Sequence, residues 1–215
     1  EMCIRDRLKT SVDFPIGIYA KDYDNNGSVD PILSCYDEGK NYPVFSKDDI
    51  QQQLTFLKKR FVKYNEYAGL TIEQVFTPKE LEGAKVLYAK NFETSYIENL
   101  GNGEFKVSAL PKQSQFSPIY GLSSGDFNKD GHIDILMGGN FTASRVKFGH
   151  YDAIKGICLL GDGSGQFKYL DASDSGLMIS GEVRDIKKLS SSNGEEYYVF
   201  VRNNDSPKIY KPKLN

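Results

Sequence analysis

The sequence lacks tryptophan and has only two histidines, His132 and His150. Hydrolytic catalysis needs a nucleophile beside a base, or a pair of convergent carboxylates, and no such arrangement stands out, so we expect no enzyme. The missing tryptophan also weakens a sugar-stacking role, although the 14 tyrosines can partly substitute. His150 lies in a polar stretch with Tyr151 and Asp152 that is a candidate ligand site, but a structural role is favoured for a lone histidine.

Other classes of protein are disfavoured by further absences. No run of eighteen apolar residues occurs, so we expect no membrane-spanning helix. Lys and Arg are scattered along a chain of net charge -2, so the basic surface of a nucleic-acid-binding protein is missing. Cys35 and Cys158 lie far apart in apolar, strand-like segments, and we expect buried thiols rather than a metal motif or a disulfide.

The first seven residues, EMCIRDR, resemble the translation of a transposase adapter used in sequencing libraries. We expect residues 1–7 to be an artefact of that origin. On this expectation the chain is a metagenomic fragment whose native sequence starts near Leu8, within a longer protein. The lack of a signal peptide then says nothing about localisation.

Two stretches alternate acidic and amide residues and then place a glycine: DYDNNGSVD at 22–30 and DFNKDGHID at 126–134. Oxygen-bearing side chains occupy positions 1, 3, 5 and 9, and glycine occupies position 6. A hard cation takes about six to eight oxygens at roughly 2.3–2.6 Å, and alternate side chains of a winding loop supply them. An Asx-rich turn is the alternative, but the repeated spacing favours a metal site.

The second loop differs from an EF-hand, because position 12 is Met137 instead of glutamate and lies in the strand-like run IDILMGG. We therefore predict loops between strands. Position 7 of each loop offers its backbone carbonyl. The candidate metal ligands are Asp22, Asp24, Asn26, Ser28, Asp30, Asp126, Asn128, Asp130, His132 and Asp134. Each loop has three carboxylates, which predicts weak binding.

Both loops belong to repeats. Segments from Ile18, Gly121 and Gly181 share a strand–turn–strand outline, and the third has lost the acidic loop. Hairpins with glycine-rich turns follow the first two, YIENLGNGEFKVSAL and GICLLGDGSGQFKYL, and SPKIYKPK is a truncated third. Strands rather than helices follow these glycines, so a phosphate cradle is disfavoured. Four strands per unit predict an all-β fold: a partial β-propeller domain of about two to three blades over residues 8–215.

Between the first loop and its hairpin, residues 46–82 are predicted to form a helical insertion. Apolar residues at Ile50, Leu54, Leu57, Phe61 and Tyr64 lie on one face of a long helix. The stretches TIEQ and TPKE fit capping boxes that start one or two shorter helices. Packing within the same domain is favoured over a partner-binding role.

These motifs resemble the FG-GAP or VCBS repeat proteins, whose blades are similar to those of the integrin α-subunit propeller. DYDNNGSVDPIL, GDFNKDGHIDILMGGN, GHYDAIKGICLLGDGSGQF, GEVRDIK and VRNND most resemble the C-terminal part of Bacteroidetes relatives of cartilage acidic protein. The resemblance covers residues 8–215. It implies a Ca²⁺-bearing propeller, exported to the periplasm, outer-membrane surface or exterior, with no established catalytic activity.

The expected function is therefore a non-catalytic calcium-binding module of an exported or cell-surface protein that binds a protein or glycan ligand. The remaining blades of the parent chain would be its other partner. The alternative is part of a calcium-dependent polysaccharide lyase resembling rhamnogalacturonan lyases, which requires catalytic Lys, Arg or Tyr residues around a bound metal. A nucleic-acid partner is disfavoured by the charge balance.

Overall fold

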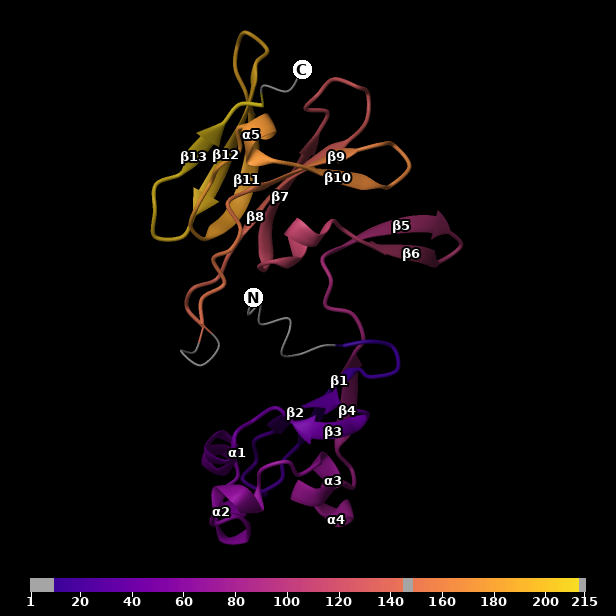
Figure 1. Cartoon of the computed structure of the whole chain (residues 1–215), viewed down its shortest axis with the longest axis vertical. Coiled ribbons are helices and arrows are strands. Elements are labelled where there is room, and N and C mark those ends of the chain that lie inside the picture. Colours follow the sequence, from indigo (N-terminus) through magenta and orange to yellow (C-terminus); the bar gives the residue numbers. More distant parts are fainter. Residues whose placement is uncertain (1–9, 145–148, 213–215) are drawn as a thin grey trace. The chain divides into compact units, whose positions relative to one another are not determined.

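The computed structural model describes residues 10–144 and 149–212. The expected artefact at residues 1–7 lies outside these ranges. The chain groups into two compact units, of which the first ends at Phe92 and the second begins at Glu93 (Figure 1). Each unit has a hydrophobic core of its own, whereas the sequence predicted one propeller domain over residues 8–215.

Strands outweigh helices in the described residues and form four antiparallel sheets, which confirms the all-β prediction. No closed ring of blades forms within residues 10–144 and 149–212. In the same part of the chain, no helix combines the length and hydrophobicity that crossing a bilayer requires.

The first unit contains one four-stranded sheet in the order β3-β2-β1-β4. Its strands are β1 (Ile16–Lys21), β2 (Asp30–Asp37), β3 (Lys40–Pro43) and β4 (Lys85–Ala89). The first acidic loop connects β1 to β2, as predicted. The hairpin YIENLGNGEFKVSAL, predicted to complete this blade, does not join the sheet. Strand β3 pairs with the free edge of β2, and β4 pairs with the free edge of β1, so neither strand of the β1–β2 pair has an edge left for it.

Short helices fill the segment between β3 and β4, within the predicted insertion at residues 46–82. They are α1 (Lys47–Gln53), α2 (Leu57–Arg60), η2 (Tyr64–Glu66), α3 (Ile72–Val75) and α4 (Pro78–Leu81). The predicted capping boxes begin α3 and α4 at Thr71 and Thr77, and a further capping box at Ser46 begins α1. The predicted long helix is wrong: the chain leaves the α-helical conformation at Leu54, and the buried Gln51 amide donates to the carbonyls of Leu57 and Phe61.

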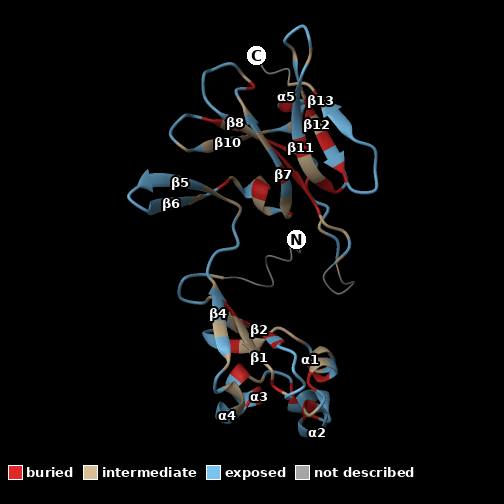
Figure 2. Cartoon of the chain, turned by 180° about the vertical axis from the view of Figure 1, so that it is seen from behind, coloured by how far each residue is buried: buried red, intermediate tan, exposed pale blue. Residues whose placement is uncertain are grey.

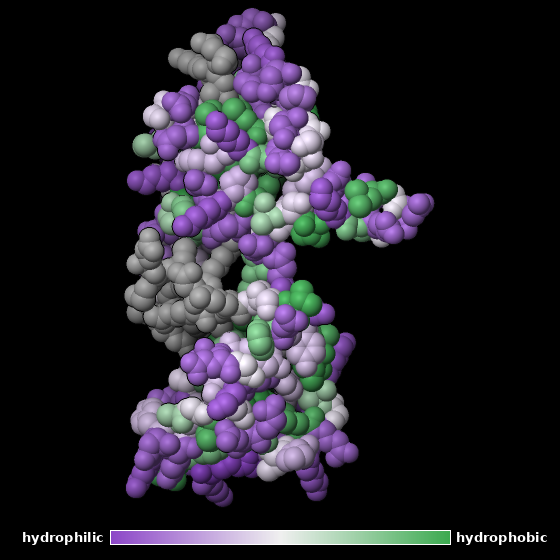
Figure 3. Space-filling model, turned by 45° about the vertical axis from the view of Figure 1, so that its right-hand side comes forward, coloured by the Kyte–Doolittle hydropathy of each residue, from purple (hydrophilic) through white to green (hydrophobic). Residues whose placement is uncertain are grey.

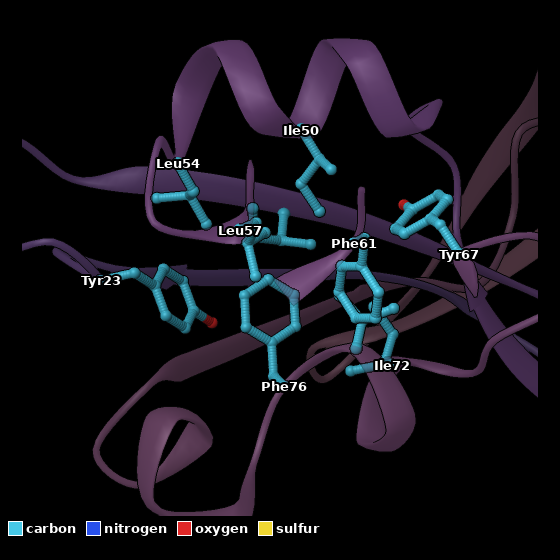
Figure 4. Close-up of a cluster of buried hydrophobic side chains, with 10 residues drawn as sticks. Tyr23, Ile50, Leu54, Leu57, Phe61, Tyr67, Ile72 and Phe76 are labelled. Atoms are coloured by element: carbon cyan, nitrogen blue, oxygen red, sulfur yellow. The ribbon is translucent and has the colours of Figure 1, made fainter. Parts of the chain in front are cut away.

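The helices bury their apolar side chains against the sheet of their own unit, as expected. Figure 4 shows side chains of this segment, with Tyr23 from the acidic loop, pointing toward one another. Ile32 of β2 belongs to the same cluster and is fully buried, as are Ile50, Leu54 and Leu57. Each such burial contributes about 1.5–3 kcal/mol to folding. Tyr64, predicted on the same face, is instead exposed because the helix has already ended.

The second unit contains the other three sheets. Its strands are β5 (Ser95–Gly101), β6 (Glu104–Ala109), β7 (Ile119–Gly125), β8 (Asp134–Gly139), β9 (Ile157–Gly161), β10 (Phe167–Leu170), β11 (Val183–Ser190), β12 (Glu196–Arg202) and β13 (Lys208–Tyr210). The short helices are η3 (Lys112–Gln115) and α5 (Ala172–Ser175). Strands β7 to β10 form the predicted four-stranded unit in sequence order, β11 to β13 form a three-stranded sheet, and β5 pairs with β6 alone.

The sheets β7–β10 and β11–β13 share a buried core, whose residues appear red in Figure 2. Leu136 of β8, Ile186 of β11 and Phe200 of β12 are members of it. The two sheets approach closely at Gly138, where a methyl group would lie 2.7 Å from a methyl carbon of Val183. The opposite face of β8 and β9 packs in a second cluster with Leu110, so the interior of the β7–β10 sheet is buried on both faces.

Candidate metal-binding loops

The two acidic loops have the same backbone conformation. Position 4 has a positive φ in both, 57° at Asn25 and 62° at Lys129. Position 6 is a glycine with φ of 88° in both, at Gly27 and Gly131. Residues with a side chain rarely adopt a φ of 88°, so glycine at position 6 allows the sharp turn. The repeated spacing in the sequence therefore corresponds to a repeated structure.

In the first loop, side-chain oxygens accept hydrogen bonds from the backbone of the loop itself. The Asp22 carboxylate accepts from the amides of Asn26 at 3.1 Å and Gly27 at 2.8 Å. The Asp24 Oδ1 also accepts from Asn26, at 3.2 Å. At position 9, Asp30 Oδ2 accepts from the amide of Tyr23 at 3.0 Å. These bonds turn the odd-numbered side chains toward the inside of the loop.

The second loop repeats this pattern position by position. The Asp126 carboxylate accepts from the amides of Asp130 at 3.1 Å and Gly131 at 3.0 Å. Asn128 Oδ1 accepts from Asp130 at 3.1 Å, and Asp130 Oδ1 accepts from His132 at 2.8 Å. In the first loop, the equivalent of this last bond joins Asn26 Oδ1 to the Ser28 amide, also at 2.8 Å.

The loops differ in how far their carboxylates converge. Asp22, Asp24 and Asp30 each bring an oxygen within 4.8 Å of the others, and they are the only such trio among the described residues. The hydrogen bonds described above use Asp24 Oδ1 and Asp30 Oδ2. The other oxygen of each carboxylate, Asp24 Oδ2 and Asp30 Oδ1, accepts no hydrogen bond from the described part of the chain, so both atoms are available to a cation. This donor set of hard carboxylate oxygens fits a hard metal ion.

In the second loop the carboxylate oxygens at positions 5 and 9 already accept hydrogen bonds, and position 3 is Asn128 instead of an aspartate. Asp130 Oδ2 accepts from the Asn128 amide at 2.8 Å. Asp134 is fully buried, and its two oxygens accept from the amides of Phe127 at 2.8 Å and Gly161 at 3.0 Å. Of the two predicted sites, the first is therefore the better organised, while Asp134 also has a structural role.

Hydrogen bonds to the carboxylates favour their charged forms. The bond from the Gly27 amide is the main cause that lowers the pKa of Asp22, and the bond from the His132 amide lowers the pKa of Asp130. Both side chains therefore stay ionised in mildly acidic solution, in the form that binds a cation.

The second loop also contacts the turn between β9 and β10. Asp134 accepts from the Gly161 amide at the end of β9. The His132 ring lies against Gly163, where a methyl group would come within 2.5 Å of the ring nitrogen Nδ1. The His132 side chain thus packs on the neighbouring turn.

A partly buried polar network around Glu182 in the second unit was not predicted. Glu182 accepts from the Thr142 hydroxyl at 2.6 Å and from Asn203 Nδ2 at 2.7 Å, and it pairs with Arg184 at 2.7 Å. Arg184 in turn donates to the carbonyl of Asn140. GEVRDIK contains Glu182 and Arg184, and VRNND contains Asn203, but only a three-dimensional arrangement could reveal that they meet. The groups satisfy one another, and the network joins the segment that follows β8 to the start of β11.

The remaining predicted sites have ordinary roles. Asp162 in GDGSG accepts from the amides of Ser164 and Gln166 and closes the hairpin turn, as predicted. Cys158 is buried and Cys35 is half-buried, and both are free thiols. Tyr151, next to His150, forms a β-bridge with Phe141.

No protein-family model, curated protein or solved structure matches the chain.

Proposed function

We propose that the chain is a non-catalytic calcium-binding module, of the FG-GAP or VCBS propeller type, from an exported or cell-surface protein. In this proposal calcium rigidifies the loops between strands, and another surface binds a ligand. The observation that carries it is the position-by-position match of the two acidic loops, together with the convergence of Asp22, Asp24 and Asp30.

Calcium suits these loops better than other common ions. Their donors are oxygens alone, with no thiolate or imidazole directed inward, which disfavours zinc. Magnesium demands a compact octahedron and keeps several waters, whereas calcium accepts six to eight oxygens from a winding loop. Asp22, Asp24, Asn26 and Asp30 supply side-chain oxygens, and Ser28 supplies a carbonyl.

The proposal also accounts for the incomplete set of blades. The β7–β10 sheet has the strand order of a propeller blade and packs face to face with β11–β13. Blades bury their faces only against neighbours, so further blades of the parent chain are the expected partners.

The test is a thermal melt of the chain in EDTA and then in millimolar calcium. At a calcium concentration about 100 times the dissociation constant, stabilisation is about 2.7 kcal/mol. We expect the double variant Asp22→Ala, Asp24→Ala to lose most of this response. The pair Asp126→Ala, Asp130→Ala should lose a smaller part, because the second loop is less convergent.

Asp162→Ala is the matched control, since Asp162 also accepts from the backbone of its own turn but lies outside the repeated loops. This variant should melt earlier with the calcium response intact. If calcium changes nothing in the unaltered chain, the loops are only turns and the proposal fails. Calcium-dependent cleavage of pectic polymers would instead support a lyase.

A further inference from the structure

A cavity of about 420 Å³ lies in the second unit, between the β5–β6 hairpin and the turn that precedes β10. Both hairpins extend to the same side of the unit in Figures 1 and 2. Ligand pockets commonly enclose 300–1,000 Å³, so this volume suits a small ligand or one or two units of a larger one. The acidic loops contribute no residue to its lining.

One face of the β5–β6 ribbon forms a wall of the cavity. Tyr96 lies opposite Ser108, and Glu98 lies opposite Lys106, so all four side chains share a face. The other face places Ile97, Phe105 and Val107 in solvent. Figure 3 shows hydrophobic residues among the exposed side chains of this projecting hairpin.

The opposite wall comes from the glycine-rich turn, which reaches the ring of Tyr96. At Gly165 a methyl group would lie 2.9 Å from the ring carbon Cε1, so only a residue without a side chain allows this approach. The Tyr96 ring packs edge-on against Phe167, with 5.4 Å between their centroids. Its orientation is therefore held by the pocket wall.

The charges of the lining cancel. Glu98 and Lys106 are its only charged residues, and their side chains lie 3.7 Å apart. A carboxylate beside an ammonium can accept from one sugar hydroxyl and donate to the neighbouring hydroxyl. The Ser108 hydroxyl and the Gln166 amide have no other side-chain partner among the described residues and extend this polar surface. An anionic ligand would lose as much at Glu98 as it gains at Lys106.

We infer that this cavity binds a neutral sugar unit of an oligosaccharide. The apolar face of such a ring suits the Tyr96 wall, and its adjacent hydroxyls suit the Glu98 and Lys106 pair. The inference deepens the proposed function, because it rests on a ligand-binding role and names the ligand class and its site. It places recognition on the β5–β6 hairpin.

Isothermal titration with neutral tetrasaccharides tests the inference. The probes are cellotetraose, mannotetraose and xylotetraose, with tetragalacturonic acid as the charged comparison, all in millimolar calcium. We expect at least one neutral probe to bind and the charged one to bind more weakly. The double variant Glu98→Gln, Lys106→Met should weaken neutral binding about tenfold or more, as the loss of hydrogen bonds to charged groups predicts.

The single variant Glu98→Gln leaves Lys106 unpaired, so its relative affinity for tetragalacturonic acid should rise. Ile97→Ala is the matched control, because Ile97 lies on the opposite face of the same ribbon and is 60% exposed. It should bind like the unaltered chain.

No binding of any neutral probe, or equal binding by the double variant, overturns the inference. If the calcium response of the thermal melt persists in that case, the calcium module stands without this sugar site. If sugar binding follows the Glu98 and Lys106 substitutions but calcium has no effect, the sugar site stands and the calcium proposal fails.

Discussion

At the residue scale, carboxylates in this chain do two kinds of work. Asp24 and Asp30 each keep an oxygen available to a cation, whereas the oxygens of Asp134 and Glu182 accept hydrogen bonds from protein donors. All four have the same functional group, and only their neighbours separate the roles. Sequence spacing alone assigned Asp30 and Asp134 to equivalent positions.

Glu182 should make stability depend on pH. The hydrogen bond from the Thr142 hydroxyl, followed by that from Asn203, lowers the pKa of Glu182 from 4.5 to about 2. A lowered pKa means that the charged form stabilises the folded state above pH 4.5, and that this contribution disappears as the pH falls toward 2.

We expect Glu182→Gln to lower the melting midpoint of the chain at neutral pH by several degrees. The difference from the unaltered chain should shrink as the pH falls below 4.5, measured by circular dichroism melts. Lys187→Ala provides a comparison, because Lys187 and Asp185 form an ion pair on the exposed surface, and such pairs contribute little to stability. A constant difference at all pH values would contradict the assigned cause.

At the element scale, the end of helix α1 depends on one buried side chain. Gln51 is 7% exposed, and its amide donates to the carbonyls of Leu57 at 3.2 Å and Phe61 at 2.7 Å. Removing it leaves buried acceptors with fewer donors, so Gln51→Ala should cost about 1–3 kcal/mol in urea unfolding.

Two further variants sharpen this prediction. Gln51→Glu has nearly the same shape but directs a carboxylate at the two carbonyls, so it should destabilise more than alanine does. Gln52→Ala is the control, since Gln52 is exposed on the same helix and should change stability by less than about 0.5 kcal/mol. Equal effects at Gln51 and Gln52 would contradict the role given to the buried amide.

Local patterns predicted elements better than their partners. The acidic loops, the capping boxes and both hairpins depend on residues near in sequence, and the structure contains them. The long helix failed because Gln51 contacts a later turn, which periodicity cannot reveal. The pairing of β4 with β1 joins residues about seventy positions apart, so the first blade could not be assembled from its repeat outline.

At the scale of the whole molecule, the chain has two units with separate cores, and each unit contains one acidic loop. We expect calorimetry to show two transitions. Ile50→Ala removes a fully buried side chain from the first unit and should cost about 2–5 kcal/mol there, shifting one transition only.

Calcium should then act on each transition through its own loop. Asp22→Ala with Asp24→Ala should remove the calcium shift of the transition that Ile50→Ala lowers, and Asp126→Ala with Asp130→Ala should affect the other. A single cooperative transition, displaced as a whole by every variant, would show that the units unfold together.

The contacts of the second loop with the turn after β9 have a thermodynamic consequence. Asp134 accepts a hydrogen bond from the Gly161 amide, and the His132 ring lies against Gly163, directly before the cavity lining that begins at Ser164. An ion that reorganises this loop changes the free energy of the turn, and a ligand that orders the turn changes that of the loop. Linkage requires calcium to change the affinity for the cavity ligand by the same factor by which that ligand changes the affinity for calcium. The affinity of the chain for its ligand would therefore depend on the calcium concentration.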